Sequence, residues 1–264
     1  MKADLNRYED PWTAEVYDFE HEGNARTADV PLWLALAEEA GGPVLELACG
    51  TARVTIPLAR PGREVTGLDM SPNMLAIARR KLDQEGRDVR ARIRLVEGDM
   101  RDFSLDQRFP LIIIPFSAFQ VLLEREDQRR CLECCARHLK PGGRLAIDVF
   151  HPKLSRLTAE GAVEEGPDEF PGPDGVTVRW SGHTDYDIAN QRLRSRCRYE
   201  RTASGGETTV SEHMLELHYF FRFEMEWMLE ACGFHVEALY GNFDRNEFAA
   251  DSPEMIFVAR KPDA

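Results

Sequence analysis

Glu46, Gly50 and Asp69 have the residue types and the spacing of a site for a nucleotide-containing cofactor. Glu46 lies in a short apolar run, Gly50 lies in the turn after it, and Asp69 ends a second apolar run 19 residues after Gly50. A glycine lets a ligand approach the backbone, and the helix behind it offers free N–H groups. An acidic residue about 20 positions further on accepts ribose hydroxyls. The spacing therefore indicates a cofactor that contains adenosine.

The turn itself narrows the choice of cofactor. Its sequence, ACGTAR at 48–53, keeps one of the three glycines that bring a backbone close to the pyrophosphate of NAD. No phosphate-binding loop of the form G-x-x-x-x-G-K-[ST] occurs in the chain. The carboxylate of Glu46 would repel a pyrophosphate and attract an ammonium group. These features disfavour an NAD-dependent oxidoreductase.

Strand-like and helix-like segments alternate through the first 150 residues. A helix is expected at 27–40, ended by two glycines, and later helices begin near Thr51 and at Ser71-Pro72. Apolar runs predict strands at 43–47, 64–68, 93–96, 111–114 and 144–150. Such alternation predicts an α/β fold, a doubly wound and mostly parallel sheet.

The pattern changes after His151. Residues 152–175 are rich in Gly, Pro and Glu and are expected to form a loop. Segments 176–184, 191–201 and 207–219 alternate in polarity and predict an antiparallel β meander, which a helix at 223–232 and strands at 235–240 and 255–260 follow.

Three regions follow from this change of pattern. Residues 1–151 are predicted to hold an N-terminal lid segment and the cofactor-binding core. Residues 152–220 are predicted to form an antiparallel β cap inserted into that core, and residues 221–264 to complete the core sheet.

Four segments of the core carry a recognisable pattern: ELACGTAR at 46–53, GLDMSPNML at 67–75, VEGDM at 96–100 and HLKPGGRLAIDVF at 138–150. Together they resemble the class I S-adenosylmethionine-dependent methyltransferases. The resemblance implies a Rossmann-like seven-stranded sheet with S-adenosyl-L-methionine as cofactor. It also implies a set of cofactor-binding residues: Glu46, Ala48, Gly50 and Thr51 near the methionine part, Asp69 on the ribose, Met70, Asp99 and Met100 near adenine, and Phe116 beside the reacting methyl group.

Two positions depart from the family pattern. Ala48 and Ala52 stand where the family has glycine. Both are small, so we expect a slightly tighter turn and retained binding. Arg53 or Arg26 is a candidate partner for the carboxylate of the cofactor.

The order of elements after the core is similar to that of small-molecule and peptide-amine N-methyltransferases, with YDFEHEG at 17–23 resembling their lid segment. Tyr17 and His151 are the candidate catalytic residues, and His151 follows a strand whose carboxyl end faces the site. His21 and His218 are further candidates for a base. Candidate acceptor-binding residues are Gln120, Tyr219 and Arg222. We expect in-line methyl transfer to a small molecule, with an amine as the favoured acceptor.

The charge of the chain bears on its partners. Its 264 residues include 33 Lys and Arg against 46 Asp and Glu, a net charge of −13, which disfavours nucleic-acid and membrane partners. The position after the fourth strand reads IPFS, whereas enzymes that methylate amino-purines have D/N-P-P-Y/F there. Methyltransfer to RNA or protein, or an inactive cofactor-binding module, remain alternatives. A cytoplasmic location is expected, and the oligomeric state is open.

The cysteines predict no metal site. Cys131, Cys134 and Cys135 form a C-x-x-C-C cluster, but no second ligand pair follows at a spacing typical of zinc. The cluster falls in a segment with helical periodicity, so we expect buried thiols on an amphipathic helix.

Overall fold

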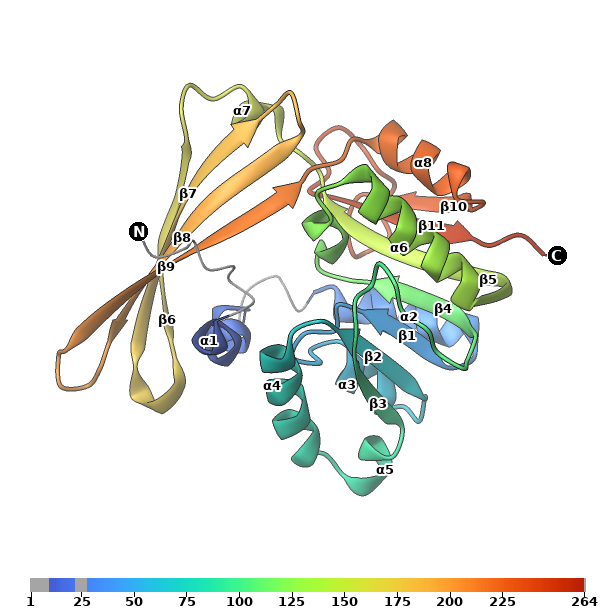
Figure 1. Cartoon of the computed structure of the whole chain (residues 1–264), viewed down its shortest axis with the longest axis horizontal. Helices are drawn as coiled ribbons and strands as arrows, with labels where there is room; N and C mark the ends of the chain where they lie inside the picture. Colours follow the sequence, from blue (N-terminus) through green and yellow to red (C-terminus); the bar gives the residue numbers. More distant parts are fainter. Residues whose placement is uncertain (1–9, 22–27, 264) are drawn as a thin grey trace.

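The computed structural model describes residues 10–21 and 28–263, and it contains two separate β-sheets (Figure 1). Seven strands form the core sheet in the order β10-β11-β5-β4-β1-β2-β3. Their bounds are β1 Val44–Leu47, β2 Val65–Asp69, β3 Ile93–Glu97, β4 Phe109–Ile114, β5 Leu139–Phe150, β10 His235–Tyr240 and β11 Glu254–Arg260. The four strands of the cap sheet are β6 Val163–Pro171, β7 Thr177–Asp187, β8 Arg192–Thr202 and β9 Thr208–His218.

The core sheet has the predicted mostly parallel architecture. Strands β1 to β5 pair in parallel, and β11 runs antiparallel between β5 and β10. All four residues of β1 are buried, as are five of the six of β4, because helices cover both faces of a parallel sheet. The predicted Rossmann-like α/β fold with an antiparallel insertion is confirmed.

Helices divide between the two faces of the core sheet. On one face, α6 (Arg125–His138) and α8 (Arg222–Ala231) pack on alternate residues of β1, β4 and β5. On the other face lie α2 (Val30–Ala40) and α3 (Thr55–Ala59). Cys131, Cys134 and Cys135 are free thiols on the buried face of α6 itself. Among the described residues no helix is long and apolar enough to span a bilayer.

The cap differs from the prediction at its start. Residues 152–175, expected to be a loop, contain the short helix α7 (Leu154–Leu157) and the strand β6. The cap sheet therefore has four strands, with β6 at its edge beside β7. An edge strand tolerates Gly166 and Pro167 because it needs hydrogen bonds on one side only, so its sequence lacks the usual strand pattern.

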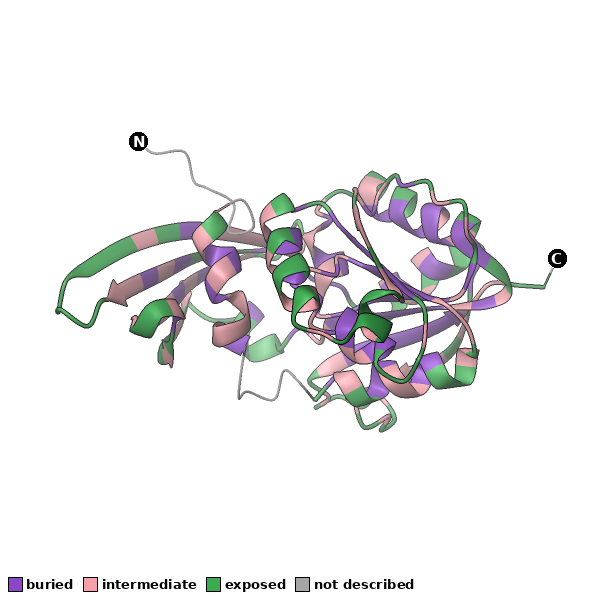
Figure 2. Ribbon diagram, turned by 90° about the horizontal axis from the view of Figure 1, so that it is seen from below, coloured by how far each residue is buried: buried purple, intermediate pink, exposed green. Residues whose placement is uncertain are grey.

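Helix α1 (Pro11–His21) lies between the cap and the core (Figure 1). Its Val16 is fully buried against Tyr199 and Val178 of the cap. On the opposite side, Asp18 accepts hydrogen bonds from the Thr51 hydroxyl at 2.6 Å and from Lys81 of α4 (Pro72–Asp83) at 2.7 Å. Figure 2 shows burial concentrated in the core, while the far ends of the cap strands are exposed.

Candidate active site

The turn after β1 has an unusual backbone. Ala48, Gly50 and Ala52 all adopt left-handed conformations, with φ of 53°, 53° and 62°. These are three of the positions at which the family pattern has glycine, and an alanine pays about 1–2 kcal/mol for this conformation. The two alanines therefore keep the shape of a glycine turn at the expense of backbone strain. A Cβ on Gly50 would meet no atom within 4 Å, so there is open space above the turn.

Asp69 joins this turn to the end of β2. Its carboxylate accepts hydrogen bonds from the backbone N–H of Gly50 at 2.7 Å and of Ser71 at 2.8 Å. Burial raises the pKa of Asp69, and these two hydrogen bonds oppose the rise. The side chain also lines the main cavity. Each carboxylate oxygen accepts more than one hydrogen bond, so Asp69 can still receive two ribose hydroxyls.

Glu46 and Thr51, two of the implied cofactor contacts, do not lie on the cavity wall, and their contact with the cofactor stays a prediction. Glu46 is 2% exposed and accepts a 2.5 Å hydrogen bond from the Thr55 hydroxyl beneath the turn. Burial raises its pKa to about 8, so Glu46 is largely neutral at pH 7 and supplies little charge to attract an ammonium group. The hydroxyl of Thr51 is directed to Asp18 of α1.

The residues predicted to lie near adenine line the cavity. Met70 is 65% exposed beside Asp69, and Met100 and Asp99 line the same cavity. The guanidinium of Arg101 forms a two-pronged contact with Asp99 and also reaches Asp127 at 2.9 Å. Hydrogen bonds from Arg101 lower the pKa of Asp99, which keeps that carboxylate ionised.

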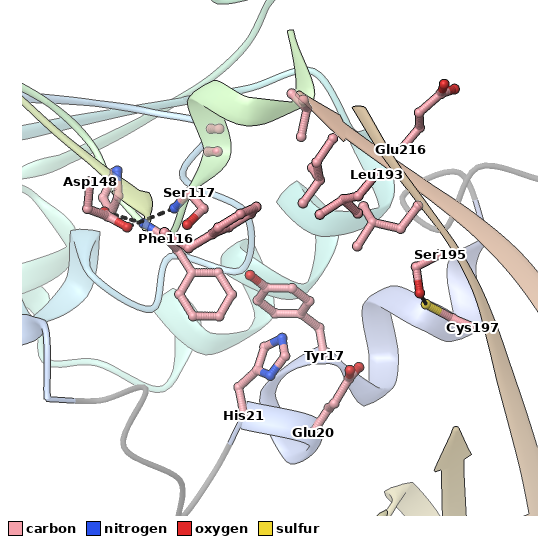
Figure 3. Close-up of a pocket in the computed structure, with 18 of the residues that line it drawn as sticks. Tyr17, Glu20, His21, Phe116, Ser117, Asp148, Leu193, Ser195, Cys197 and Glu216 are labelled. Atoms are coloured by element: carbon pink, nitrogen blue, oxygen red, sulfur yellow. Dashed lines mark hydrogen bonds between the residues drawn. The ribbon is translucent and has the colours of Figure 1, made fainter. Parts of the chain in front are cut away.

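A second strained turn follows β4. Phe116 and Ser117 are both left-handed, with φ of 63° and 55°. Their N–H groups donate to the carboxylate of Asp148, at 2.6 and 2.9 Å (Figure 3). Burial raises the pKa of Asp148 to about 7. The sequence analysis missed Asp148; its signal was a single acidic residue within the otherwise apolar end of β5.

This turn directs Phe116 toward α1. The Phe116 ring lies 6.2 Å from that of Tyr17 and 5.1 Å from that of His21, measured between centroids. Tyr17 and His21 also pack edge to face at 4.5 Å. All three side chains line the cavity, so the structure brings predicted Tyr17 and Phe116 together (Figure 3).

Arg53 is held behind this aromatic group. Its guanidinium pairs with both carboxylate oxygens of Asp29, at 2.6 and 2.7 Å, and lies 4.8 Å from the centroid of Phe116. Asp29 also accepts a hydrogen bond from the indole of Trp33. The network fixes the position of Phe116 from below. Arg26, the other candidate for the cofactor carboxylate, lies outside the described residues.

His151 lies on the cavity wall just after β5. Its Nδ1 is 2.9 Å from the carbonyl oxygen of Ser252. A carbonyl only accepts, so Nδ1 donates to Ser252, and Nε2 is the ring nitrogen left to accept a hydrogen bond or a proton. The ring packs edge to face on Phe248, which fixes its plane.

The three candidate acceptor-binding residues do not line the cavity. Gln120 is fully buried, accepts from the N–H of Phe150 and donates to the carbonyl of His218. Tyr219 is also fully buried where the cap rejoins the core. Arg222 lies on the surface of α8 and pairs with Glu226. Gln120 thus joins the point where the chain leaves the core to the point where it returns, and Tyr219 lies directly after the second point. His218, another base candidate, lies 3.3 Å from Glu224.

The cap supplies a wall that the sequence analysis did not assign. A cavity of about 2240 Å³ extends from the cofactor turns to the concave face of the cap. Alternate residues of β8 face it, with Leu193, Ser195 and Cys197 opposite Tyr17 (Figure 3). Other lining residues are Trp180, Thr184, Tyr186, Leu215 and Leu217. Alternation in the sequence predicted strands here but did not show which face would meet the core.

The donors and acceptors fit S-adenosylmethionine. An acidic residue faces the open space above the glycine turn, an exposed methionine offers an apolar surface to adenine, and an ionised Asp99 can accept from the adenine amino group. Sheet order and turns together define a nucleotide-cofactor fold of the Rossmann-like class.

Comparisons with known proteins give the family. A family described as "Methyltransferase domain" matches residues 44–143. The cypemycin N-terminal methyltransferase of Streptomyces sp is 28% identical, with 96% of this chain and 97% of that protein covered. The dTDP-3-amino-3,6-dideoxy-alpha-D-glucopyranose N,N-dimethyltransferase of Streptomyces fradiae is 29% identical, with 86% of each covered.

A solved structure extends the similarity to nearly the whole chain. The CcbJ methyltransferase from Streptomyces caelestis superposes with a TM-score of 0.78 at 25% identity, and 97% of this chain and 98% of that chain are covered. The chain belongs to the class I S-adenosylmethionine-dependent methyltransferases, and its cofactor is S-adenosylmethionine.

Proposed function

We propose that the protein transfers a methyl group to the nitrogen of a small-molecule amine. The observation that carries this proposal is the position of His151, which lines the same cavity as Phe116 and Tyr17 while Ser252 holds its ring through Nδ1. A protonated amine has no lone pair and must lose a proton before it can attack. The names of the relatives from Streptomyces agree with this acceptor class.

The residues then have distinct tasks. When bound, S-adenosylmethionine supplies a methyl carbon activated by its sulfonium, and the C–N bond forms as the C–S bond breaks toward sulfur. His151 takes the proton of the amine on Nε2 while Ser252 holds the ring through Nδ1. Phe116, Tyr17 and His21 shape the wall beside the methyl group and exclude water from it. Helix α1 and the cap close the cavity on the acceptor side.

Replacement of His151 tests this proposal. We expect His151→Ala to lower kcat for an amine acceptor by about 100-fold, the usual range for loss of a general base, and to leave the Kd for S-adenosylmethionine within twofold. His235→Ala is the matched control because His235 is exposed on β10 and away from the cavity. Turnover would be followed by mass spectrometry of the methylated product. Unchanged kcat in His151→Ala would show that His151 is not the base. Methyl transfer to oxygen but not to nitrogen would overturn the proposal.

A further inference from the structure

The acceptor side of the cavity is strongly acidic. Strand β6 contributes four acidic residues to the wall and no basic residue. Others come from α1, from β9, from the loop between β10 and β11, and from the first residue of β11. The eight acidic side chains on this side are Glu20, Glu164, Glu165, Asp168, Glu169, Glu216, Asp244 and Glu254.

Cationic side chains on this side are few and mostly neutralised. Arg156 pairs with Glu165 at 2.6 Å, and Arg194 pairs with Glu216 at 3.1 Å. Lys153 also lines the cavity, and within residues 10–21 and 28–263 it is the one such cation without a carboxylate partner. Two of the three cations are thus already paired, and the wall keeps an excess of negative charge.

Backbone groups that could bind a phosphate are also occupied. Successive left-handed residues direct their N–H groups to one point and form an anion-binding nest. Phe116 and Ser117 are such a pair, but Asp148 already accepts both hydrogen bonds. A diphosphate carries about two negative charges and usually requires arginines, lysines or a free nest. The acceptor side of this cavity has few such groups to bind a diphosphate.

A positively charged acceptor fits the same wall well. Asp168 and Glu169 are exposed at the rim and have no ion-pair partner among the described residues. Their field attracts a cation before it binds. Deeper in the cavity, Leu193, Leu215 and Trp180 offer apolar surface to the body of the acceptor.

We propose that the acceptor is an aliphatic amine that is cationic in solution and carries no phosphate, so that the same amine linked to a nucleoside diphosphate is a poor substrate. This inference rests on the proposed amine methyltransferase activity. It separates the chain from its relative named for a dTDP-amino sugar, although the two are similar over most of their length. Free amino sugars and small peptides with a free N-terminus share the required chemistry.

A matched pair of acceptors tests the inference. The first is the methyl glycoside of 3-amino-3,6-dideoxy-glucose, and the second is the same sugar linked to dTDP. We expect kcat/KM for the free amino sugar to exceed that for the dTDP-linked sugar by at least tenfold. A tripeptide amide with a free N-terminus is the third acceptor and shows which of the two sources of a cationic amine is preferred. A higher kcat/KM for the dTDP-linked sugar would overturn the inference.

Variants of β6 test whether charge is the cause. In Asp168→Asn/Glu169→Gln, we expect KM for the cationic acceptor to rise three- to tenfold at low salt, with the Kd for S-adenosylmethionine unchanged. The control Glu160→Gln/Glu207→Gln removes two exposed charges away from the cavity wall and should leave KM unchanged. Asp168→Lys/Glu169→Lys should narrow the gap between the free and dTDP-linked sugars. An equal rise of KM in the test and control variants would overturn the role of β6.

The two proposals fail in different ways. If the protein binds S-adenosylmethionine but methylates none of the three amines, the proposed amine methyltransferase activity is wrong, and so is the inference that rests on it. If it methylates amines but prefers the dTDP-linked sugar, the inference alone falls.

Discussion

The two walls of the cavity are built in contrasting ways. The cofactor wall consists of turns that follow neighbouring parallel strands, so each contact comes from a few consecutive residues. The acceptor wall is assembled from α1, from the concave face of a four-stranded sheet and from the region where β10 joins β11, so its members lie more than about 200 positions apart, from Tyr17 to Glu254. The first wall is therefore fixed by the core fold, whereas the second depends on how α1 and the cap pack on that core.

Strain is concentrated on the cofactor wall and its border. Ala48, Ala52, Phe116 and Ser117 all occupy left-handed backbone regions, and buried carboxylates of Asp69 and Asp148 hold the turns in place. On the acceptor side, half of the eight acidic side chains are exposed, namely Glu164, Asp168, Glu169 and Asp244. Binding of the cofactor thus relies on preorganised backbone, and binding of the acceptor on charge and shape.

Removal of the Asp69 carboxylate should affect the cofactor wall most. In Asp69→Ala, the Kd for S-adenosylmethionine should rise at least tenfold, because two ribose hydrogen bonds are lost at about 1.5–3 kcal/mol for bonds to a charged group. The N–H groups of Gly50 and Ser71 also lose their acceptor. Calorimetry with Asp69→Ala and with Asp106→Ala, a control at an exposed carboxylate outside the cavity, would measure this. An unchanged Kd in Asp69→Ala would contradict the view that the cofactor wall, with Asp69 in it, binds the cofactor.

Asp148 lies where the two walls meet, and its replacement should lower kcat more than it weakens binding of the cofactor. In Asp148→Asn, an amide NH₂ group faces one of the two N–H groups that the carboxylate accepts, so the turn that carries Phe116 shifts. We expect kcat to fall about tenfold while the Kd for S-adenosylmethionine changes less than threefold. A larger change in Kd than in kcat would assign Asp148 to the cofactor wall instead.

The raised pKa of Asp148 gives the same residue a pH signature. Protonation below a pKa of about 7 puts an O–H against one amide, so wild-type kcat should fall between pH 8 and pH 6 more steeply than that of Asp148→Asn. Stability should move the other way. The folded pKa is above the unfolded value, so the stabilising contribution is complete below about pH 4 and is lost as pH rises toward 7, by at most about 1.4 kcal/mol per pH unit. Denaturant unfolding of both proteins across this pH range would show it.

The smallest expected effect concerns backbone strain. Ala48→Gly should raise the free energy of unfolding by about 1 kcal/mol, because glycine adopts φ near 53° without steric cost. Ala52→Gly should gain less, because its methyl group is buried against Ile56 and Ala78 and its loss costs about 0.8 kcal/mol. Urea unfolding of the two variants compares them directly. Equal stabilisation by both would show that burial of the Ala52 methyl group contributes little.

The same contrast explains what could be predicted from the sequence. The core strands and the position of Asp69 follow from local patterns, because each parallel strand brings its turn to the same edge of the sheet. The positions of Asp99 and Phe116 were implied by the family resemblance. Local spacing does not show that the side chain of Glu46 lies beneath the turn and accepts a hydrogen bond from Thr55. Strand β6 was missed because backbone pairing with β7, rather than side-chain alternation, holds it. Gln120 and Tyr219 were assigned to the acceptor because only the packed structure shows that they are enclosed.

The enclosed Gln120 has a consequence for how the cap is joined to the core. Its amide ties together the point where the chain leaves the core, at Phe150, and the point where it returns, at His218. With both points held by one side chain, we expect changes of sequence or length within the cap to leave the strands that carry the cofactor turns in place. The shape of the acceptor side could then change while the cofactor turns keep their geometry.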